Sequence, residues 1–223
     1  MKEFTKRKKW DRIRREKMAK AKDNPTDCTP TRKSDPVKEM NELYNTNRGV
    51  DKAGCDGKVG GVKSSESGIK ATDEKIFTNN PFDENGELKP NVKYKAGEFE
   101  YNYETDEKGR ISNWNTDNLR LTEREERLPH ESNTPGKLKG DHAGHLAGDR
   151  FGGSEKLDNI VSQSQNVNLS QYKKLENKWA KEIKAGKEVT VNVDIKYDDS
   201  MRPTLFIVDY TIDGDLFSQI IYN

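Results

Sequence analysis

The sequence is poor in hydrophobic residues, cysteine and histidine, and each shortage narrows what the protein can be. Hydrophobic residues make up 30% of the 223 residues and charged residues 35%, so part of the chain is expected to lie outside a packed core. No run approaches about 18 apolar residues, so we predict no membrane segment in this chain. Cys28 and Cys55 match no metal-binding spacing, and two cysteines are too few for a disulfide framework.

Charge is distributed unevenly along the chain, although the formal net charge is only +1. Residues 1–22 contain eleven Lys or Arg and three acidic residues, which gives this stretch a net charge of +8. Such a stretch is typical of a solvated linker helix or of a segment that binds nucleic acid or another acidic surface, and both interpretations stay open. No apolar region follows it, so no signal peptide is expected in this chain.

The composition predicts a tether followed by one folded domain. Residues 23–80 are rich in glycine, proline, serine and charge, which favours loops and linkers, with one short helix expected at 36–44. Regular alternation of apolar residues begins only near Val92. We therefore predict a basic, partly irregular N-terminal tether over residues 1–90 and a folded domain over residues 91–223.

Alternation of apolar and polar residues predicts an antiparallel sheet in this domain. Residues 92–115 are interpreted as a β-hairpin that turns at 106–109. Residues 118–130 are interpreted as a short helix or as a strand followed by a charged loop. The other predicted strands are 189–197, 204–212 and 216–223, and Asp213-Gly214 is the hairpin turn between the last two.

One long helix is predicted before Gly186, which is a typical stop signal. Its apolar residues recur at spacings of three and four, as the buried face of a helix requires. They are Leu169, Tyr172, Leu175, Trp179 and Ile183. With the strands, this helix predicts an α+β fold.

The stretch "GDHAGHLAGDRFGG", residues 140–153, holds two of the three histidines, His142 and His145. Either both bind one metal ion, completed by Asp141 or Asp149, or one of them does chemistry and the other does not. A structural zinc site would need about four nitrogen or sulfur ligands. Neither cysteine is close in sequence, and the third histidine lies in a charged loop, so the residues favour the second possibility.

Polar residues downstream suggest what that chemistry is. Asn168 lies near the predicted start of the long helix, where its amide could also be a cap. Glu176 follows it by eight residues, close to two helical turns. A histidine followed by a helix that carries asparagine can form a one-metal phosphodiesterase site: the histidine activates water, and the amide oxygen holds a hard cation such as Mg²⁺. The helix N-terminus adds partial positive charge.

The residues "HAGH", followed by Asn159, Gln163, Asn168 and Glu176, resemble the DNA/RNA non-specific endonucleases of the ββα-metal, or His-Me finger, class. The signature of that family is Asp-Arg-Gly-His, followed by an asparagine, a glutamine, a metal-binding asparagine and a glutamate. The longer string from Lys139 to Gly214 is similar to a branch found as the C-terminal toxin domain of LXG-type polymorphic toxins. The resemblance covers roughly residues 101–223 and implies a ββα-metal nuclease core.

The resemblance implies a role for each matching residue. His145 takes the position of the general base, and Asn168 takes that of the ligand to Mg²⁺, with Mn²⁺ as an alternative ion. Glu176 would complete the catalytic group by holding a metal-bound water. Asn159, placed in the same catalytic group, and Gln163 would support the loop or contact the phosphate.

Two positions depart from the signature. His142 stands where the family has aspartate, which makes it a supporting residue. Ala143 stands where the family has arginine, so a positive charge near the phosphate is missing there. Arg150, Lys139 or Lys178 could supply that charge, and the sequence leaves the choice among them open.

Taken with the resemblance, the sequence predicts a Mg²⁺-dependent endonuclease that cleaves DNA, and RNA as a further substrate. It would act as a toxin domain, delivered into target cells as part of a longer secreted protein, with a cognate immunity protein as partner. Two alternatives stay open. One is a catalytically weakened module that binds nucleic acid, and the other is a structural domain that holds zinc through His142 and His145.

Overall fold

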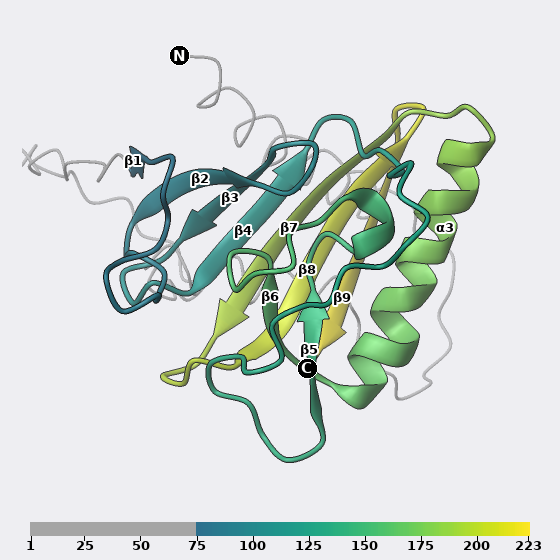
Figure 1. Cartoon of the computed structure of the whole chain (residues 1–223). Coiled ribbons are helices and arrows are strands. Elements are labelled where there is room, and N and C mark those ends of the chain that lie inside the picture. Colours follow the sequence, from purple (N-terminus) through teal and green to yellow (C-terminus); the bar gives the residue numbers. More distant parts are fainter. Residues whose placement is uncertain (1–74) are drawn as a thin grey trace, which may run out of the picture. The chain divides into compact units, whose positions relative to one another are not determined.

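Residues 75–223 are the part of the chain that the computed structural model describes. The basic stretch at 1–22, the helix expected at 36–44 and both cysteines lie outside the described residues. Within 75–223 a seven-stranded sheet has the order β1-β2-β3-β4-β7-β8-β9, and β5 and β6 form a separate pair (Figure 1). The strands of the large sheet are β1 (Ile76–Phe77), β2 (Val92–Ala96), β3 (Tyr101–Thr105), β4 (Ile111–Thr116), β7 (Val189–Tyr197), β8 (Pro203–Ile212) and β9 (Asp215–Tyr222).

The first part of the sheet has one strand more than the sequence indicated. Residues 92–116 form the meander β2-β3-β4 rather than a single hairpin. Gly97, with φ of +81°, makes the additional turn between β2 and β3, because only glycine adopts that conformation at low cost. The aromatic alternation was interpreted correctly: Tyr101 and Tyr103 are buried, and the ring of Tyr103 stacks on Tyr94 with centroids 5.3 Å apart.

The last part of the sheet confirms the predicted meander. β7 pairs with β8 along its whole length, and β8 pairs with β9, all antiparallel. Asp213 and Gly214 turn the chain between β8 and β9, with φ of +49° and +88°. Positive φ at both central residues is the geometry whose twist matches a two-residue hairpin.

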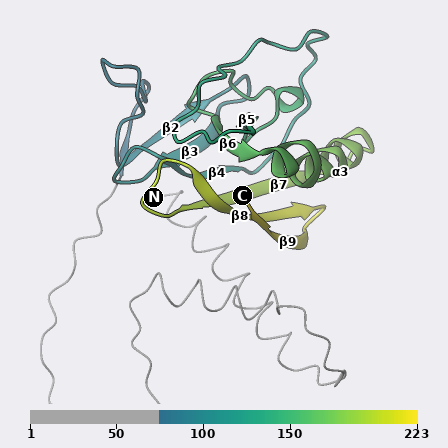
Figure 2. The ribbon, with the colours of Figure 1, turned by 90° about the horizontal axis from the view of Figure 1, so that it is seen from below.

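The long helix and the small strand pair cover one face of the large sheet (Figure 2). The strand pair is β5 (Asp141–His145) with β6 (Ile160–Ser164), and the helix is α3 (Tyr172–Lys184). Tyr172 of α3 meets Phe206 of β8 edge to face, and Trp179 meets Tyr210 in the same way. The indole of Trp114 in β4 also donates a hydrogen bond to the hydroxyl of Tyr172. The succession β5, β6, α3 is the ββα unit that the sequence led us to expect.

The helix begins with a wide turn that sequence periodicity did not reveal. Residues Val167–Gln171 form a π turn, η2, that leads directly into α3, and the N–H of Tyr172 donates to the carbonyl of Val167. This turn changes the register of the apolar face. Leu169, predicted to be buried, is 50% exposed, whereas Leu175 and Trp179 are buried as predicted. The helix ends before Gly186, which has φ of +81°.

The stretch at 118–130 forms neither the helix nor the strand that we considered for it. It is part of an irregular segment between β4 and β5, which we call the arginine loop and define as residues 117–140. Its backbone is tied to η1, a 3₁₀ turn at Asp149–Phe151, because the N–H of Thr122 donates to the carbonyl of Arg150. Charged residues without apolar periodicity carry no signal for such a path.

No helix formed by residues 75–223 is long and apolar enough to cross a membrane. The short strand β1, upstream of the predicted boundary between residues 90 and 91, pairs in parallel with β2. The division of the chain at that boundary stays a prediction.

Candidate active site

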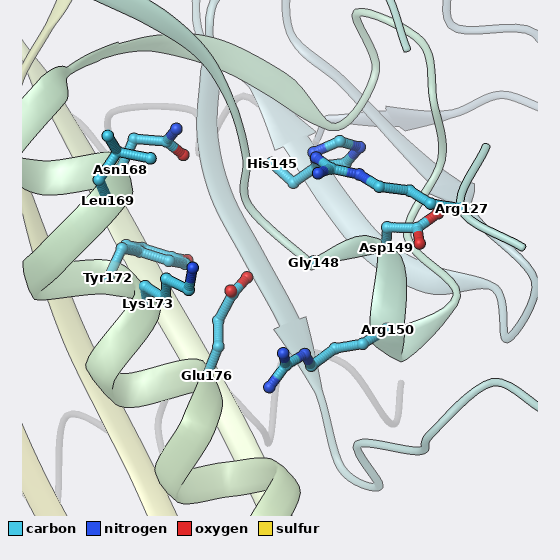
Figure 3. A pocket seen from close by; sticks show the side chains of 10 residues that line it. All are labelled: Arg127, His145, Gly148, Asp149, Arg150, Asn168, Leu169, Tyr172, Lys173 and Glu176. Carbon is cyan, nitrogen blue, oxygen red and sulfur yellow. The ribbon is translucent and has the colours of Figure 1, made fainter. Parts of the chain in front are cut away.

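A pocket of about 290 Å³ lies between η1, the arginine loop and the start of the long helix (Figure 3). Three segments that are far apart in sequence contribute to it. Its lining residues are Arg127, His145, Gly148, Asp149, Arg150, Asn168, Leu169, Tyr172, Lys173 and Glu176. The pocket therefore brings together the predicted base, the predicted metal ligand and the predicted glutamate.

His145 is the last residue of β5 and is only 9% exposed. Burial lowers its pKa to about 4, and the neighbouring His130 and Arg127 act in the same direction, while Asp149 opposes them. The rings of His130 and His145 meet edge to face, with centroids 4.9 Å apart. The imidazole of His145 is therefore neutral near pH 7, which is the form that can accept a proton.

His142 does not share the environment of His145, although only two residues separate them. Side chains three apart on a strand point to opposite faces, and both residues belong to β5. His142 does not line the pocket; its Nδ1 accepts a hydrogen bond of 3.1 Å from the amide of Asn168. A zinc site that uses both imidazoles does not fit this geometry.

The wide turn η2 aligns Asn168 with Glu176. In a regular α-helix, eight residues overshoot two turns by about 80°. A π turn takes up about one more residue than an α turn, so one turn of each spans about eight residues. Both side chains consequently point into the pocket from one side of the helix (Figure 3). Asn168 lies inside the π turn, where it makes no cap hydrogen bond.

Glu176 is held in a confined position opposite η1. Burial raises the pKa of its carboxyl to about 7, against the influence of Arg150, Arg127 and Lys173, which lower it. A side chain at Gly148 would place its Cβ only 2.2 Å from Oε1 of Glu176 and would displace this carboxylate from its present position. The site thus contains an acid whose charge is poorly compensated by the protein itself.

The amide of Asn168 and the carboxylate of Glu176 suit a hard divalent cation. The Nδ2 atom of Asn168 is engaged with His142, and its amide oxygen faces the pocket on the side of His145 (Figure 3). Mg²⁺ characteristically takes one or two protein oxygens and keeps several waters. The two donors present are oxygens, which favour such an ion over structural zinc, whose ligands are mostly nitrogen and sulfur. Among residues 75–223, no three His, Cys, Asp or Glu side chains cluster as metal ligands.

Asn159 lies behind the pocket and is completely buried. Its Oδ1 accepts from the hydroxyl of Tyr103 at 2.7 Å and from the N–H of Ala147 at 2.8 Å. Its Nδ2 donates to the carbonyls of Ala147 and Ser154. All its hydrogen-bonding positions are used inside the protein, so direct contact of Asn159 with a substrate does not fit the structure.

Gln163 is also fully buried and packs against Gly144. A Cβ at position 144 would lie 2.2 Å from Cδ of Gln163, which explains the glycine between the two histidine positions. The Nε2 of Gln163 makes a long hydrogen bond of 3.5 Å to the carbonyl of His145. Gln163 therefore supports the backbone that carries His145.

Of the three basic residues considered as substitutes for the signature arginine, the pocket includes only Arg150. The Nη1 of Arg150 donates to the amide oxygen of Asn177 at 2.8 Å. Lys178 instead bonds the hydroxyl of Tyr210 and lies 4.0 Å above the ring of Phe217. Lys139 is exposed and does not line the pocket.

Sequence reasoning missed three residues at the site, namely Arg127, His130 and Lys173. Lys173 could have been found, because it follows Asn168 by five residues and precedes Glu176 by three on a predicted helix. Arg127 and His130 carry no such signal, because they belong to the irregular arginine loop.

The residues of the pocket lie within a stretch that matches a known protein family. A family model described as DNA/RNA non-specific endonuclease matches residues 90–214. The chain is 38% identical over 146 residues to "Type VII secretion system protein EssD" of Staphylococcus aureus strains USA300 and NCTC 8325, covering 61% of this chain and 24% of those proteins. The chain thus spans about a quarter of the length of these curated relatives. The crystal structure of NucA from Streptococcus agalactiae with magnesium ion bound is similar with a TM-score of 0.45 and 18% identity, over 61% of this chain and 74% of that one.

Proposed function

This chain belongs to the DNA/RNA non-specific endonuclease family, and from that premise we propose that residues 91–223 form a Mg²⁺-dependent endonuclease that hydrolyses DNA, and RNA as a further substrate. One observation carries the proposal: a single pocket contains a buried neutral histidine, His145, together with the amide of Asn168 and the carboxylate of Glu176. Residues 1–90 are proposed as its tether.

His145 acts as the general base. It takes a proton from a water molecule that attacks phosphorus, the 3′-oxygen leaves, and the product carries a 5′-phosphate. Burial keeps the pKa of His145 low in the free protein, so the imidazole is ready to accept the proton at neutral pH. A bound phosphate would bring negative charge close to the ring and strengthen it as a base.

Asn168 would hold the divalent cation through its amide oxygen, with Mn²⁺ as an alternative to Mg²⁺. When bound, the ion supplies positive charge that stabilises the charge developing on the phosphate. Glu176 accepts hydrogen bonds from water in the pocket. His142 orients the amide of Asn168 through their 3.1 Å contact.

The buried amides act as positioning residues in this proposal. Asn159 fixes the backbone after His145, and Gln163 fixes β5 from beneath Gly144. Neither needs to reach the substrate. A site of this kind contacts the phosphate backbone rather than base edges, so its sequence preference is low.

The named relatives support a proposal for the biological setting. EssD is described as a protein of a type VII secretion system, and we propose that this chain acts as the toxin part of a longer secreted protein. A cell that makes such a nuclease must protect its own nucleic acid. We therefore propose a cognate immunity protein as partner.

The proposed function is tested by incubating plasmid DNA with the protein and Mg²⁺, with and without EDTA, and repeating the assay with single variants. His145→Ala should lower cleavage by about 10²–10⁴-fold, since that is the usual contribution of a positioned base. Asn168→Ala should abolish the Mg²⁺-dependent cleavage, and circular dichroism should show an unchanged fold.

His142→Ala is the matched control and should cost distinctly less than His145→Ala. A larger loss for His142→Ala would reverse the assignment of the two histidines. Cleavage that EDTA does not affect would refute the metal-dependent mechanism.

A further inference from the structure

The arginine of the family signature is replaced in this chain by Ala143, which lies in β5 and is half-buried. Hydrolysis of a phosphodiester builds negative charge on the phosphate, and a cation aimed at that charge is a large part of catalysis. Three cationic side chains line the pocket, Arg127, Arg150 and Lys173. All three act on the carboxyl of Glu176, but only Arg127 is also close enough to His145 to lower the pKa of that imidazole.

Arg150 is already engaged, because its Nη1 donates to the amide oxygen of Asn177 at 2.8 Å. Arg127 makes no hydrogen bond and no ion pair with any residue in 75–223, and its guanidinium extends toward the imidazole of His145 (Figure 3). The charge of Arg127 is also close enough to lower the pKa of His145, after burial and the effect of His130. The guanidinium of Arg127 thus lies beside the base, and its N–H groups donate to no residue in 75–223.

The segment that carries Arg127 is fastened to the site on both sides of that residue. The Oδ1 of Asp149 accepts from Nη2 of Arg124 at 3.3 Å and from the N–H of Leu128 at 3.4 Å. Arg124 is also paired with Glu98 across 3.4 Å. One carboxylate of η1 therefore holds the chain three residues before and one residue after Arg127.

More distant backbone contacts hold the same loop. The N–H of Thr122 donates to the carbonyl of Arg150, and the N–H of Glu131 donates to the carbonyl of Glu155, both at 2.9 Å. The backbone position of Arg127 beside the pocket is consequently set by the fold, and its exposed side chain extends from this fixed point.

We propose that Arg127 is a further catalytic residue that contacts the scissile phosphate and supplies the positive charge that the family signature places at position 143. This inference rests on the proposed nuclease function. A guanidinium can donate two parallel hydrogen bonds to two phosphate oxygens and keeps its charge at any working pH. His145 takes the proton of the attacking water, while Arg127 keeps its own protons and stabilises the charge that forms.

The test compares Arg127→Ala, Arg127→Lys and Lys139→Ala in Mg²⁺-dependent cleavage of a DNA duplex at saturating substrate. Lys139→Ala is the matched control, because it removes one positive charge from the same loop but outside the pocket. Arg127→Ala should lower kcat about 10²-fold, the usual cost of losing one aimed donor, with an unchanged melting temperature. Arg127→Lys should recover part of that loss, because it restores charge but not the paired donors. Lys139→Ala should change kcat by less than about twofold, because a screened surface charge contributes little at saturation.

A second variant places an arginine at position 143, where the family signature has one. Position 143 is two residues before His145 on the same strand, so the two side chains share a face. Adding Ala143→Arg to the Arg127→Ala protein should raise kcat about tenfold or more, because a guanidinium again meets the phosphate.

The inference would be overturned if Arg127→Ala and Lys139→Ala lost kcat equally, or if Arg127→Ala kept the wild-type kcat. The proposed function would remain intact in either case, provided that His145→Ala is still inactive. The proposed function itself fails in a different way, because the unmodified protein would then show no Mg²⁺-dependent cleavage.

Discussion

Replacing Glu176 by glutamine should stabilise the metal-free protein at alkaline pH while it removes activity. Burial raises the pKa of this carboxyl from 4.5 to about 7 in the folded state. The folded protein therefore binds the proton more tightly than the unfolded chain, and ionisation of Glu176 destabilises the fold. This cost is small below pH 4.5, grows as the pH rises, and reaches its full size above pH 7.

The size of the effect follows from the two pKa values. A difference between 4.5 and about 7 corresponds to about 3 kcal/mol of unfolding free energy once Glu176 is ionised. His145 acts in the opposite direction, because its pKa is lowered from 6.5 to about 4, so its contribution to stability is lost as the pH falls from 6.5. Comparison of variant with wild type at each pH cancels the His145 contribution.

The measurement is urea unfolding of wild type and Glu176→Gln in EDTA at pH 4.5 and pH 8. Relative to wild type, the variant should gain about 3 kcal/mol between the two pH values, with an unchanged denaturant slope. Glu125→Gln, which changes an exposed carboxylate of the arginine loop, should show no such gain. The stability difference between Glu176→Gln and wild type could instead be the same at both pH values, or change in the opposite direction. Either result would refute the raised pKa of Glu176 in the folded protein.

Two further predictions concern the neighbours of the base and the support behind it. His130→Ala should raise the pKa of His145 from about 4 toward its ordinary 6.5, because a neighbouring ring that disfavours the charged form of His145 is removed. An NMR titration measures this pKa, and a fall in its value would contradict the contact between the two rings. Asn159→Ala should lower the unfolding free energy by roughly 2–4 kcal/mol, because the hydroxyl of Tyr103 and the backbone of Ala147 lose buried partners. Denaturant unfolding checks this, with the exposed Asn177→Ala as a control expected to cost much less.

The parts of the fold that follow a regular period were predictable from sequence. β7 alternates apolar and polar residues, β8 and β9 are rich in β-branched and aromatic residues, and the turn at Asp213-Gly214 needs residues that tolerate positive φ. The meander at 92–116 was predicted as a single hairpin, because the alternation was followed across Gly97 without a turn being placed there. Glycine with φ of +81° supplies that turn.

The candidate site residues were identified through the resemblance to a known family rather than through periodicity. His145, Asn168 and Glu176 line one pocket, as their order in the sequence suggested. The burial of Asn159 was not predictable, because its partners come from β3 and from the stretch after β5. Arg127 was not predictable either, since its place depends on hydrogen bonds from the arginine loop to Asp149, which leave no periodic trace in the sequence.

Because residues 167–171 form a π turn, Asn168 and Glu176 share one side of the helix although eight residues separate them. A regular α-helix brings side chains seven residues apart to nearly the same angle, since two turns take about 7.2 residues. A homologue that had lost one residue here, and the π turn with it, would present the same asparagine and glutamate to its pocket. Evolution can therefore insert or delete a residue at this point without moving the catalytic groups. A search for distant members of the family should accordingly allow a one-residue gap between these two positions.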